Sequence, residues 1–156
     1  MSNVKPQMTD STAPAKRPRK DGQISGLAGE FFAAAELLKR GIQTSVTFGN
    51  AKSIDLLAYN ATTKSSFVVQ VKTLREKNFF LIDHKKVERE FIYVFVLLNK
   101  LGKHVQYFVV PGEALCSHPE RFSKYFLIEK MPGIHSNLLG ELGYEDAWSC
   151  FGPTAA

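Results

Sequence analysis

Two alternating segments around a short polar turn constrain the fold of this chain more than any other feature of its sequence. Apolar and polar residues alternate over 53–59 and again over 66–73, and turn-forming residues fill 60–65. A period of two is that of a β-strand with one face toward a core. The sequence therefore predicts an antiparallel hairpin and excludes a purely helical domain.

The polar residues of this hairpin are expected on one of its faces. If the turn is centred between Thr62 and Thr63, Asp55 lies directly across from Gln70. Cross-strand partners have Cβ atoms about 5 Å apart. Lys72, two residues beyond Gln70, projects to the same face. We expect the three side chains to form one polar patch on a sheet that is otherwise apolar.

Further segments predict a mixed domain around this hairpin. Two apolar runs suit covered strands, a short β-prone segment precedes the hairpin, and three segments favour helix. The predicted strands are Thr44–Phe48, Ser53–Tyr59, Ser66–Thr73, Phe91–Leu98 and Val105–Val110, and the predicted helices are Ser25–Arg40, 111–125 and Asn137–Trp148. This order predicts an α/β (α+β) fold with one central mixed sheet flanked by helices.

The first of these helices carries a candidate site residue. Alanine and leucine dominate it, and Gly41 suits the left-handed residue that ends a helix. An apolar repeat at i, i+4, i+7 and i+11 predicts one buried stripe, formed by Leu27, Phe31, Ala34 and Leu38. Glu30 flanks this stripe, so its carboxylate is expected at the edge of the core.

Charge and composition divide the chain into a tail and one domain. The 156 residues are 44% hydrophobic and carry a net charge of +5, which suits a single globular domain over 23–156. Residues 1–22 hold few large apolar side chains, and five basic against two acidic residues. We expect this tail to be disordered. Its basic cluster is either a solvated arm or an arm that binds phosphates.

A second basic segment surrounds the polar patch. Lys64–Arg89 contains seven basic and three acidic residues. This segment is either an ordinary solvated surface or a surface that binds nucleic-acid phosphates. The candidate phosphate contacts are Arg75, Lys77, Lys85 and Lys86.

The polar patch has the ligand types that a hard divalent cation requires. Mg²⁺ prefers oxygen ligands and takes one or two protein carboxylates together with substrate phosphate and water. Asp55 offers a carboxylate, Gln70 an amide oxygen and Val71 a backbone carbonyl, and Glu30 offers a second carboxylate. Lys72 can orient or deprotonate an attacking water, or neutralise phosphate charge. We predict a Mg²⁺ site, with Mn²⁺ as a substitute, that hydrolyses phosphodiesters.

Several segments together resemble the PD-(D/E)XK nuclease superfamily, in particular small homing-endonuclease-like and uncharacterised bacterial members with a Q-V-K-T ending. The resemblance rests on Gly29-Glu30, residues 37–42, Asp55 and the run Val69-Gln70-Val71-Lys72-Thr73. Segments 91–98, 107–111 and 145–148 are also similar, so the resemblance covers residues 24–149. It implies a restriction-endonuclease-like core, with Asp55, Gln70 and Lys72 as the D…(E/Q)xK set and Glu30 as the helix acid.

The sequence leaves three functions open. The first is a metal-dependent DNA endonuclease, with catalytic residues Asp55, Gln70, Lys72 and Glu30. The second is a catalytically weak or inactive nucleic-acid-binding or interaction module on the same fold, because Gln70 replaces the superfamily's glutamate and removes a negative charge. The third is a homodimeric structural domain without nucleic acid. Because so small a chain cannot easily surround a duplex, the first function also predicts a homodimer.

The sequence argues against a membrane or secreted protein. No run reaches the roughly 18 apolar residues of a membrane-spanning helix, and the first residues lack the apolar region of a secretory signal. Cys116 and Cys150 do not make a disulfide framework. We therefore expect a cytoplasmic protein with no membrane partner.

Overall fold

The computed structural model describes residues 20–48 and 54–155. The tail predicted over residues 1–22 lies outside the described residues up to position 19. Its last three residues belong to the first helix, α1 (Lys20–Lys39), which begins five residues before the predicted start at Ser25.

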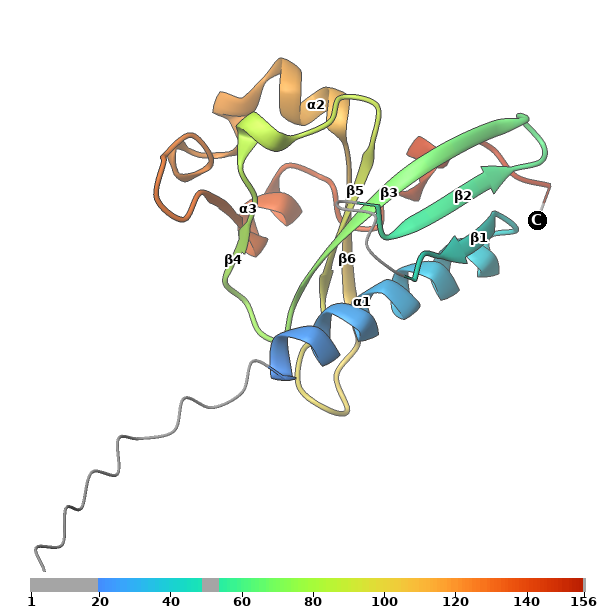
Figure 1. Ribbon diagram of the computed structural model, residues 1–156, viewed down its shortest axis with the longest axis horizontal. Helices are drawn as coiled ribbons and strands as arrows, with labels where there is room; N and C mark the ends of the chain where they lie inside the picture. Colours follow the sequence, from blue (N-terminus) through green and yellow to red (C-terminus); the bar gives the residue numbers. More distant parts are fainter. Residues whose placement is uncertain (1–19, 49–53, 156) are drawn as a thin grey trace, which may run out of the picture.

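A five-stranded mixed sheet forms the centre of the molecule (Figure 1). Its strands, in spatial order, are β1 (Gln43–Val46), β2 (Leu56–Asn60), β3 (Ser65–Leu74), β5 (Ile92–Leu97) and β6 (Gln106–Pro111). Strands β3 and β5 are parallel, and the other neighbours are antiparallel. A small second sheet, which the sequence did not predict, pairs β4 (Phe79–Leu81) with β7 (Gly133–His135).

The two faces of the central sheet are covered by different elements. Helix α1 packs on one face, and α2 (Gly112–Ser117), α3 (Ser136–Glu141) and the β4–β7 pair cover the other. Four short 3-10 helices complete the described structure, at His84–Lys86, Pro119–Phe122, Lys124–Phe126 and Trp148–Phe151. This arrangement confirms the predicted mixed α/β fold with a central sheet flanked by helices.

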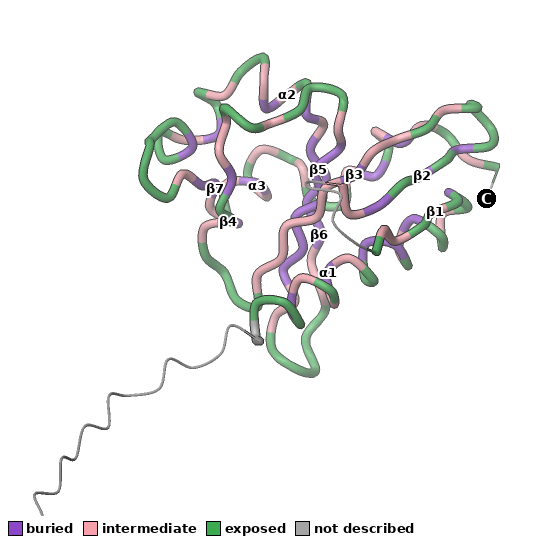
Figure 2. The backbone as a smooth tube through the Cα atoms, in the orientation of Figure 1, coloured by how far each residue is buried: buried purple, intermediate pink, exposed green. Residues whose placement is uncertain are grey.

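A separate hydrophobic core lies on each side of the sheet. The core under α1 contains Leu37, Val94 and Phe151, and the core on the opposite face contains Phe80 and Phe95. All six residues of β5 are buried, and Figure 2 shows this strand crossing the middle of the buried region. Burial on both faces explains why β5 reads as a continuous apolar run in the sequence.

The predicted hairpin has the predicted register. Asn60 is opposite Ser65 and Leu56 is opposite Val69, so the turn is centred between positions 62 and 63. Asn60 is buried, and its Oδ1 accepts hydrogen bonds from the backbone N–H groups of the next turn. Its Nδ2 donates to the carbonyl oxygen of Phe151 at 2.8 Å. This buried amide attaches the hairpin to the end of the domain.

The buried stripe predicted for α1 is wrong in three of its four residues. Ala34 is buried, but Leu27, Phe31 and Leu38 are exposed to 44%, 49% and 54%. The face toward the sheet consists mainly of small side chains, at Ser25, Gly29, Ala33, Ala34 and Leu37. Small side chains occupy this face because they allow the helix axis to lie close to the strands.

The two C-terminal helices are shorter than predicted. Helix α2 ends at Ser117 rather than near 125, because Pro119 restricts the residue before it and starts a 3-10 turn. Helix α3 ends at Glu141 rather than at Trp148, and Gly143 follows it with a positive φ of 85°. The segment between α2 and α3 consequently contains no long helix, and it forms one wall of a surface groove.

Two predicted absences can be compared with the described residues. Both cysteines are free. In residues 20–48 and 54–155, no helix combines the length and the apolar character needed to cross a membrane.

Candidate active site

Asp55 lies immediately before β2, at the point where this strand leaves β3. Its backbone N–H donates to the carbonyl of Val69 at 3.1 Å, and its own carbonyl accepts from the Thr47 N–H at 2.9 Å. The Thr47 hydroxyl also donates to that carbonyl, at 3.1 Å. The Asp55 backbone is therefore held from both neighbouring segments.

The Asp55 carboxylate is oriented by β3. Its Oδ2 accepts a hydrogen bond of 2.7 Å from the backbone N–H of Val71. This carboxylate oxygen takes the place of a backbone carbonyl of a neighbouring strand as the acceptor for the Val71 N–H. The hydrogen bond fixes the Asp55 rotamer and leaves Oδ1 for a ligand. The backbone of Val71, a predicted metal ligand, adjoins Asp55 through this bond.

Gln70 and Lys72 project from β3 to the same face, as predicted. They are opposite Tyr93 and Phe95 of β5, and both line a cavity of about 410 Å³. The other charged residues that line this cavity are Asp83, Lys86 and Glu129. The alternate residue Val69 is fully buried in the core under α1.

Glu30 reaches the site from α1. It is partly buried, and its pKa is raised above the usual value by this burial and by the negative charge of Asp55. The negative charges of Glu30 and Asp55 therefore repel each other. Two carboxylates that repel each other favour a bound cation between them.

The close approach of α1 depends on Gly29, next to Glu30. A Cβ atom at Gly29 would lie 1.9 Å from Oγ1 of Thr73 on β3, so only glycine fits here.

In the parts of the chain that the structure describes, no three His, Cys, Asp or Glu residues cluster as metal ligands. A metal here would therefore need the amide of Gln70 and backbone oxygen besides Asp55 and Glu30.

Lys72 has a perturbed pKa in this setting. Burial lowers its pKa below the ordinary 10.5, Asp55 acts in the opposite direction, and Lys86 lowers it again. Desolvation is the largest cause, because burial disfavours the charged form of a lysine. A larger fraction of Lys72 is therefore neutral at a given pH than for an exposed lysine.

The four predicted phosphate contacts fall in three places. Lys86 lines the cavity of Gln70 and Lys72, and Lys85 is its exposed neighbour in the same 3-10 helix. Arg75 lies beyond the end of β3, where its Nε donates to Ser25 Oγ of α1 at 2.7 Å. Lys77 lines a different cavity, together with Glu141 and Glu145.

Two residues of the site had no assigned role in the sequence analysis. Thr47 holds the Asp55 carbonyl, and Gly29 admits α1 to β3. The glycine left a weak signal, because a glycine inside an alanine-rich helix costs about 1 kcal/mol and implies a packing reason. Thr47 left none, because a threonine at the end of a strand is ordinary.

Comparison with known proteins supports the fold. No family profile matches the sequence, and no curated protein does. Among solved structures, the chain is similar to a bacterial homing endonuclease, I-Ssp6803I, at 16% identity and a TM-score of 0.54, over 82% of this chain and 88% of that one. A second similar structure is Hjc of Archaeoglobus fulgidus, a Holliday junction resolvase, at 16% identity and a TM-score of 0.47, over 74% and 88%. At this identity the first likeness shows a shared fold, and it agrees with the restriction-endonuclease-like core expected from the sequence.

Proposed function

We propose that the protein is a metal-dependent endonuclease that hydrolyses phosphodiester bonds in DNA. One observation supports the proposal: the Asp55 carboxylate, which the Val71 N–H of β3 holds by a hydrogen bond, interacts electrostatically both with Glu30 and with Lys72, whose pKa is lowered. The fold shared with a homing endonuclease also supports it.

The donor set suits Mg²⁺, or Mn²⁺ as its substitute. Asp55, Glu30, the Gln70 amide oxygen and the Val71 carbonyl are hard oxygen ligands, and the charge repulsion between the two carboxylates would be relieved by a cation. When bound, the metal supplies Lewis acidity toward the phosphate and its water. Asp55 would be the best-ordered ligand, because both its backbone and its carboxylate are held by hydrogen bonds.

Lys72 would act on the attacking water. Its lowered pKa makes the neutral amine more accessible than in an exposed lysine. The neutral amine can accept a proton from the attacking water, and the ammonium so formed offsets the negative charge of Asp55 and of the phosphate. As the water oxygen bonds to phosphorus, the bond from phosphorus to the leaving oxygen breaks, and solvent protonates that oxygen. Lys85 and Lys86 would bind phosphates beside the scissile bond, and Arg75 and Lys77 would bind more distant phosphates of the same strand.

We propose that the protein acts in the cytoplasm.

The alternative is a nucleic-acid-binding module on the same fold that has lost efficient cleavage. Gln70 favours it, because an amide binds Mg²⁺ more weakly than a carboxylate does. The two functions differ in metal binding, which isothermal titration of Mg²⁺ measures. Binding that Asp55→Ala abolishes supports the endonuclease, whereas a wild-type protein that binds no Mg²⁺ supports the alternative.

Plasmid nicking with Mg²⁺ or Mn²⁺ tests the endonuclease directly. Asp55→Ala and Lys72→Ala should each reduce cleavage by about 10²-fold or more. Glu90→Ala and Lys100→Ala are the matched controls, since both side chains are exposed and neither lines the site. Cleavage that survives both site substitutions would refute the proposal, as would a wild-type protein that cleaves no nucleic acid.

We also propose that the protein is a homodimer that pairs through α1. The outward face of this helix carries an exposed apolar stripe, which we call the outer stripe, formed by Ile24, Leu27, Phe31 and Leu38. With Ala28 and Ala35, these residues follow the alternating three- and four-residue spacing of packed helix pairs. A second copy is the occupant that presents the same stripe across a twofold axis, and two copies provide two sites for the two strands of a duplex.

A further inference from the structure

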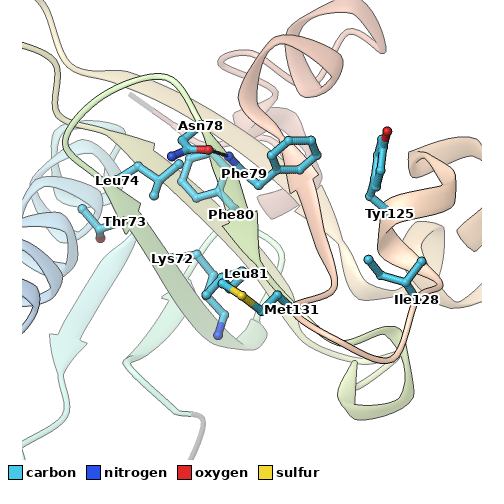
Figure 3. Close-up of a pocket in the computed structure, with 10 residues that line it drawn as sticks. All are labelled: Lys72, Thr73, Leu74, Asn78, Phe79, Phe80, Leu81, Tyr125, Ile128 and Met131. Atoms are coloured by element: carbon cyan, nitrogen blue, oxygen red, sulfur yellow. Dashed lines mark hydrogen bonds between the residues drawn. The ribbon is translucent and has the colours of Figure 1, made fainter.

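A large groove lies beside the candidate site, on the face of the sheet away from α1. It has a volume of about 800 Å³, which falls within the roughly 300–1,000 Å³ of sites for small molecules. Strands β3 and β4 form one wall and the segment between α2 and β7 forms the other (Figure 3). Its lining includes Lys72, Asn78, Phe79, Tyr125, Ile128 and Met131.

Lys72 joins this groove to the site. The same side chain lines both the groove and the smaller cavity of Gln70 and Lys86. A ligand in the groove would therefore be continuous with a phosphate held at Lys72. None of the residues that line the groove on its far wall has a part in the proposed cleavage chemistry.

Apolar and aromatic side chains lie open to solvent around the groove. Tyr125 is 46% exposed, Leu81 is 53% exposed and Met131 is 75% exposed. Met131 also has a positive φ of 50°, a backbone conformation that costs free energy for a residue with a side chain. Exposed apolar side chains gathered at one place on a folded protein mark a binding surface.

The aromatic rings of the groove contact one another edge-on. The Phe79 ring meets that of Tyr125 edge-on at a centroid distance of 5.4 Å, and that of His135 at 5.0 Å. Figure 3 shows Tyr125 and Ile128 across the groove from Phe79 and Lys72. Lys124 lies over the Tyr125 ring, with its Nζ 5.2 Å from the centroid. Exposed aromatic side chains next to positive charge are what single-stranded nucleic acid binds.

We propose that this groove holds a nucleobase displaced from its base pair, next to the phosphate at Lys72. This inference rests on the proposed function and names its substrate class, which is DNA with an unpaired nucleotide beside the cleaved bond. The base would stack on the half-exposed Tyr125 ring, which Phe79 supports edge-on, and Met131 would fill the space that the base vacates. The Asn78 side-chain amide, whose Oδ1 already accepts from the Phe79 N–H at 2.8 Å, offers its Nδ2 to a base edge.

The physical consequence is a preference for DNA that is already unpaired. Removing a base from a stacked duplex costs free energy, and this cost is smallest for a mismatched or bulged base. A protein that holds a displaced base therefore binds a bulged duplex more tightly than a fully paired duplex of the same sequence. Phosphate contacts alone would give no such difference.

The test is a binding measurement without cleavage. A duplex with a single bulged 2-aminopurine is compared with its fully paired counterpart in EDTA, by fluorescence of the probe base and by anisotropy. Wild-type protein should bind the bulged duplex more tightly and change the probe fluorescence on binding. Tyr125→Ala should weaken binding to the bulged duplex about tenfold and leave the paired duplex unchanged.

Two further variants control for folding and for general loss of affinity. Tyr125→Phe keeps the ring and should retain the preference. Leu101→Ala removes a fully exposed apolar side chain that does not line the groove, and should also retain it. Met131→Ser should reduce the preference independently of Tyr125.

The outcomes separate this inference from the proposed function. Equal affinity for the two duplexes, or a preference that survives both Tyr125→Ala and Met131→Ser, overturns the base pocket and leaves the endonuclease standing. A groove that instead holds a protein partner would show that same insensitivity to the bulge. Base-dependent binding without cleavage in Mg²⁺ would retain the pocket and overturn the endonuclease.

Discussion

Lys72 is the residue whose chemistry pH can test most directly. Burial lowers its pKa below the ordinary 10.5, so the neutral amine forms at lower pH than in an exposed lysine. If the neutral amine accepts a proton from water, the cleavage rate should rise with pH and level off at this lowered pKa. Lys72→Arg stays protonated at all accessible pH values, so it should cleave about 10²–10⁴ times more slowly and lose the pH-dependent rise.

The Lys72→Arg variant also distinguishes catalysis from simple charge. A lysine that only neutralises the phosphate would be replaced well by arginine, because both carry a positive charge. Single-turnover rates of the two proteins over pH 6–10 would decide. A rise with pH that persists in Lys72→Arg contradicts the assignment of Lys72 as the base.

Glu30 should lower the stability of the metal-free protein. Because its folded pKa is raised, the folded state gains stability from the bound proton below the unfolded pKa, and loses this gain as pH rises through the folded pKa. At neutral pH the ionised Glu30 is therefore unfavourable, and Glu30→Gln should raise the melting temperature in EDTA. The difference should shrink in acid, where wild-type Glu30 is protonated.

Mg²⁺ should reverse the order of the two proteins. The wild type has two carboxylates for the metal and should be stabilised more by added Mg²⁺ than Glu30→Gln is. Glu90→Gln, at an exposed carboxylate outside the site, is the control. If Glu30→Gln melts at the same temperature as the wild type at neutral pH in EDTA, the charges of Glu30 and Asp55 have no effect on stability. The assignment of Glu30 to the site is then wrong.

At the residue scale, the sequence predicted those features of the site that depend on strand periodicity. The pairing of Asp55 with Gln70 follows from the hairpin centre, and the common face of Gln70 and Lys72 follows from the period of two. The structure has the predicted register, and Gln70 and Lys72 line one cavity. The hydrogen bond from the Val71 N–H to the Asp55 carboxylate depends on where β2 leaves β3, which no local pattern encodes. The same is true of Thr47, whose hydrogen bonds come from the pairing of β1 with β2.

At the scale of elements, the contact between α1 and β3 decides whether Glu30 reaches the site. Gly29→Ala places a methyl group where Thr73 Oγ1 already lies, so the helix and strand must separate. We expect a loss of about 1–3 kcal/mol in the free energy of unfolding, together with weaker Mg²⁺ binding. Chemical denaturation and calorimetry measure the two effects.

Gly26→Ala is the matched control for this substitution. It lies on the same helix, and a Cβ atom there would meet nothing within 4 Å. Alanine at Gly26 should stabilise the protein by about 0.5–1 kcal/mol, because it lowers the backbone entropy of the unfolded chain. Equal effects of the two substitutions would mean that helix propensity, and not packing against β3, determines the role of Gly29.

The elements that sequence reasoning missed are those fixed by tertiary contacts. The apolar residues of α1 identify a helix, but they do not say which face meets the sheet, and close packing selected Gly29 and Ala33 over the larger Phe31. Strands β4 and β7 have three residues each, too few for a periodic signal. Their pairing joins segments more than fifty positions apart.

At the scale of the whole molecule, the two faces of the sheet contribute different parts of the proposed site. The face under α1 is closed by small side chains and supplies Glu30, and the opposite face carries Gln70, Lys72 and the open groove. Substrate can approach from the groove side without displacing α1. The outer stripe of α1 lines neither the groove nor the smaller cavity, so it is available to a second copy of the chain.

Disrupting the outer stripe should separate the proposed dimer without unfolding the protein. Phe31 is 49% exposed in the single chain, so Phe31→Asp removes little core packing but puts a charge in the centre of the helix pair. Light scattering should show a dimer for the wild type and a monomer for Phe31→Asp, with similar circular dichroism. Leu101→Asp, at a fully exposed loop position, should remain a dimer.

Cleavage products then show whether dimerisation matters for function. Each site lies within one chain, so a monomeric Phe31→Asp should still nick one strand of a supercoiled plasmid. It should make linear product much more slowly than the wild type, because linear product requires cuts in both strands at one position. A wild type that is monomeric both free and bound to DNA would refute the dimer, whereas a dimer that survives Phe31→Asp would refute pairing through α1. In either case the exposed side chains of α1 would need another partner, since the outer stripe from Ile24 to Leu38 is about 21 Å long and such a stripe is rarely left in water.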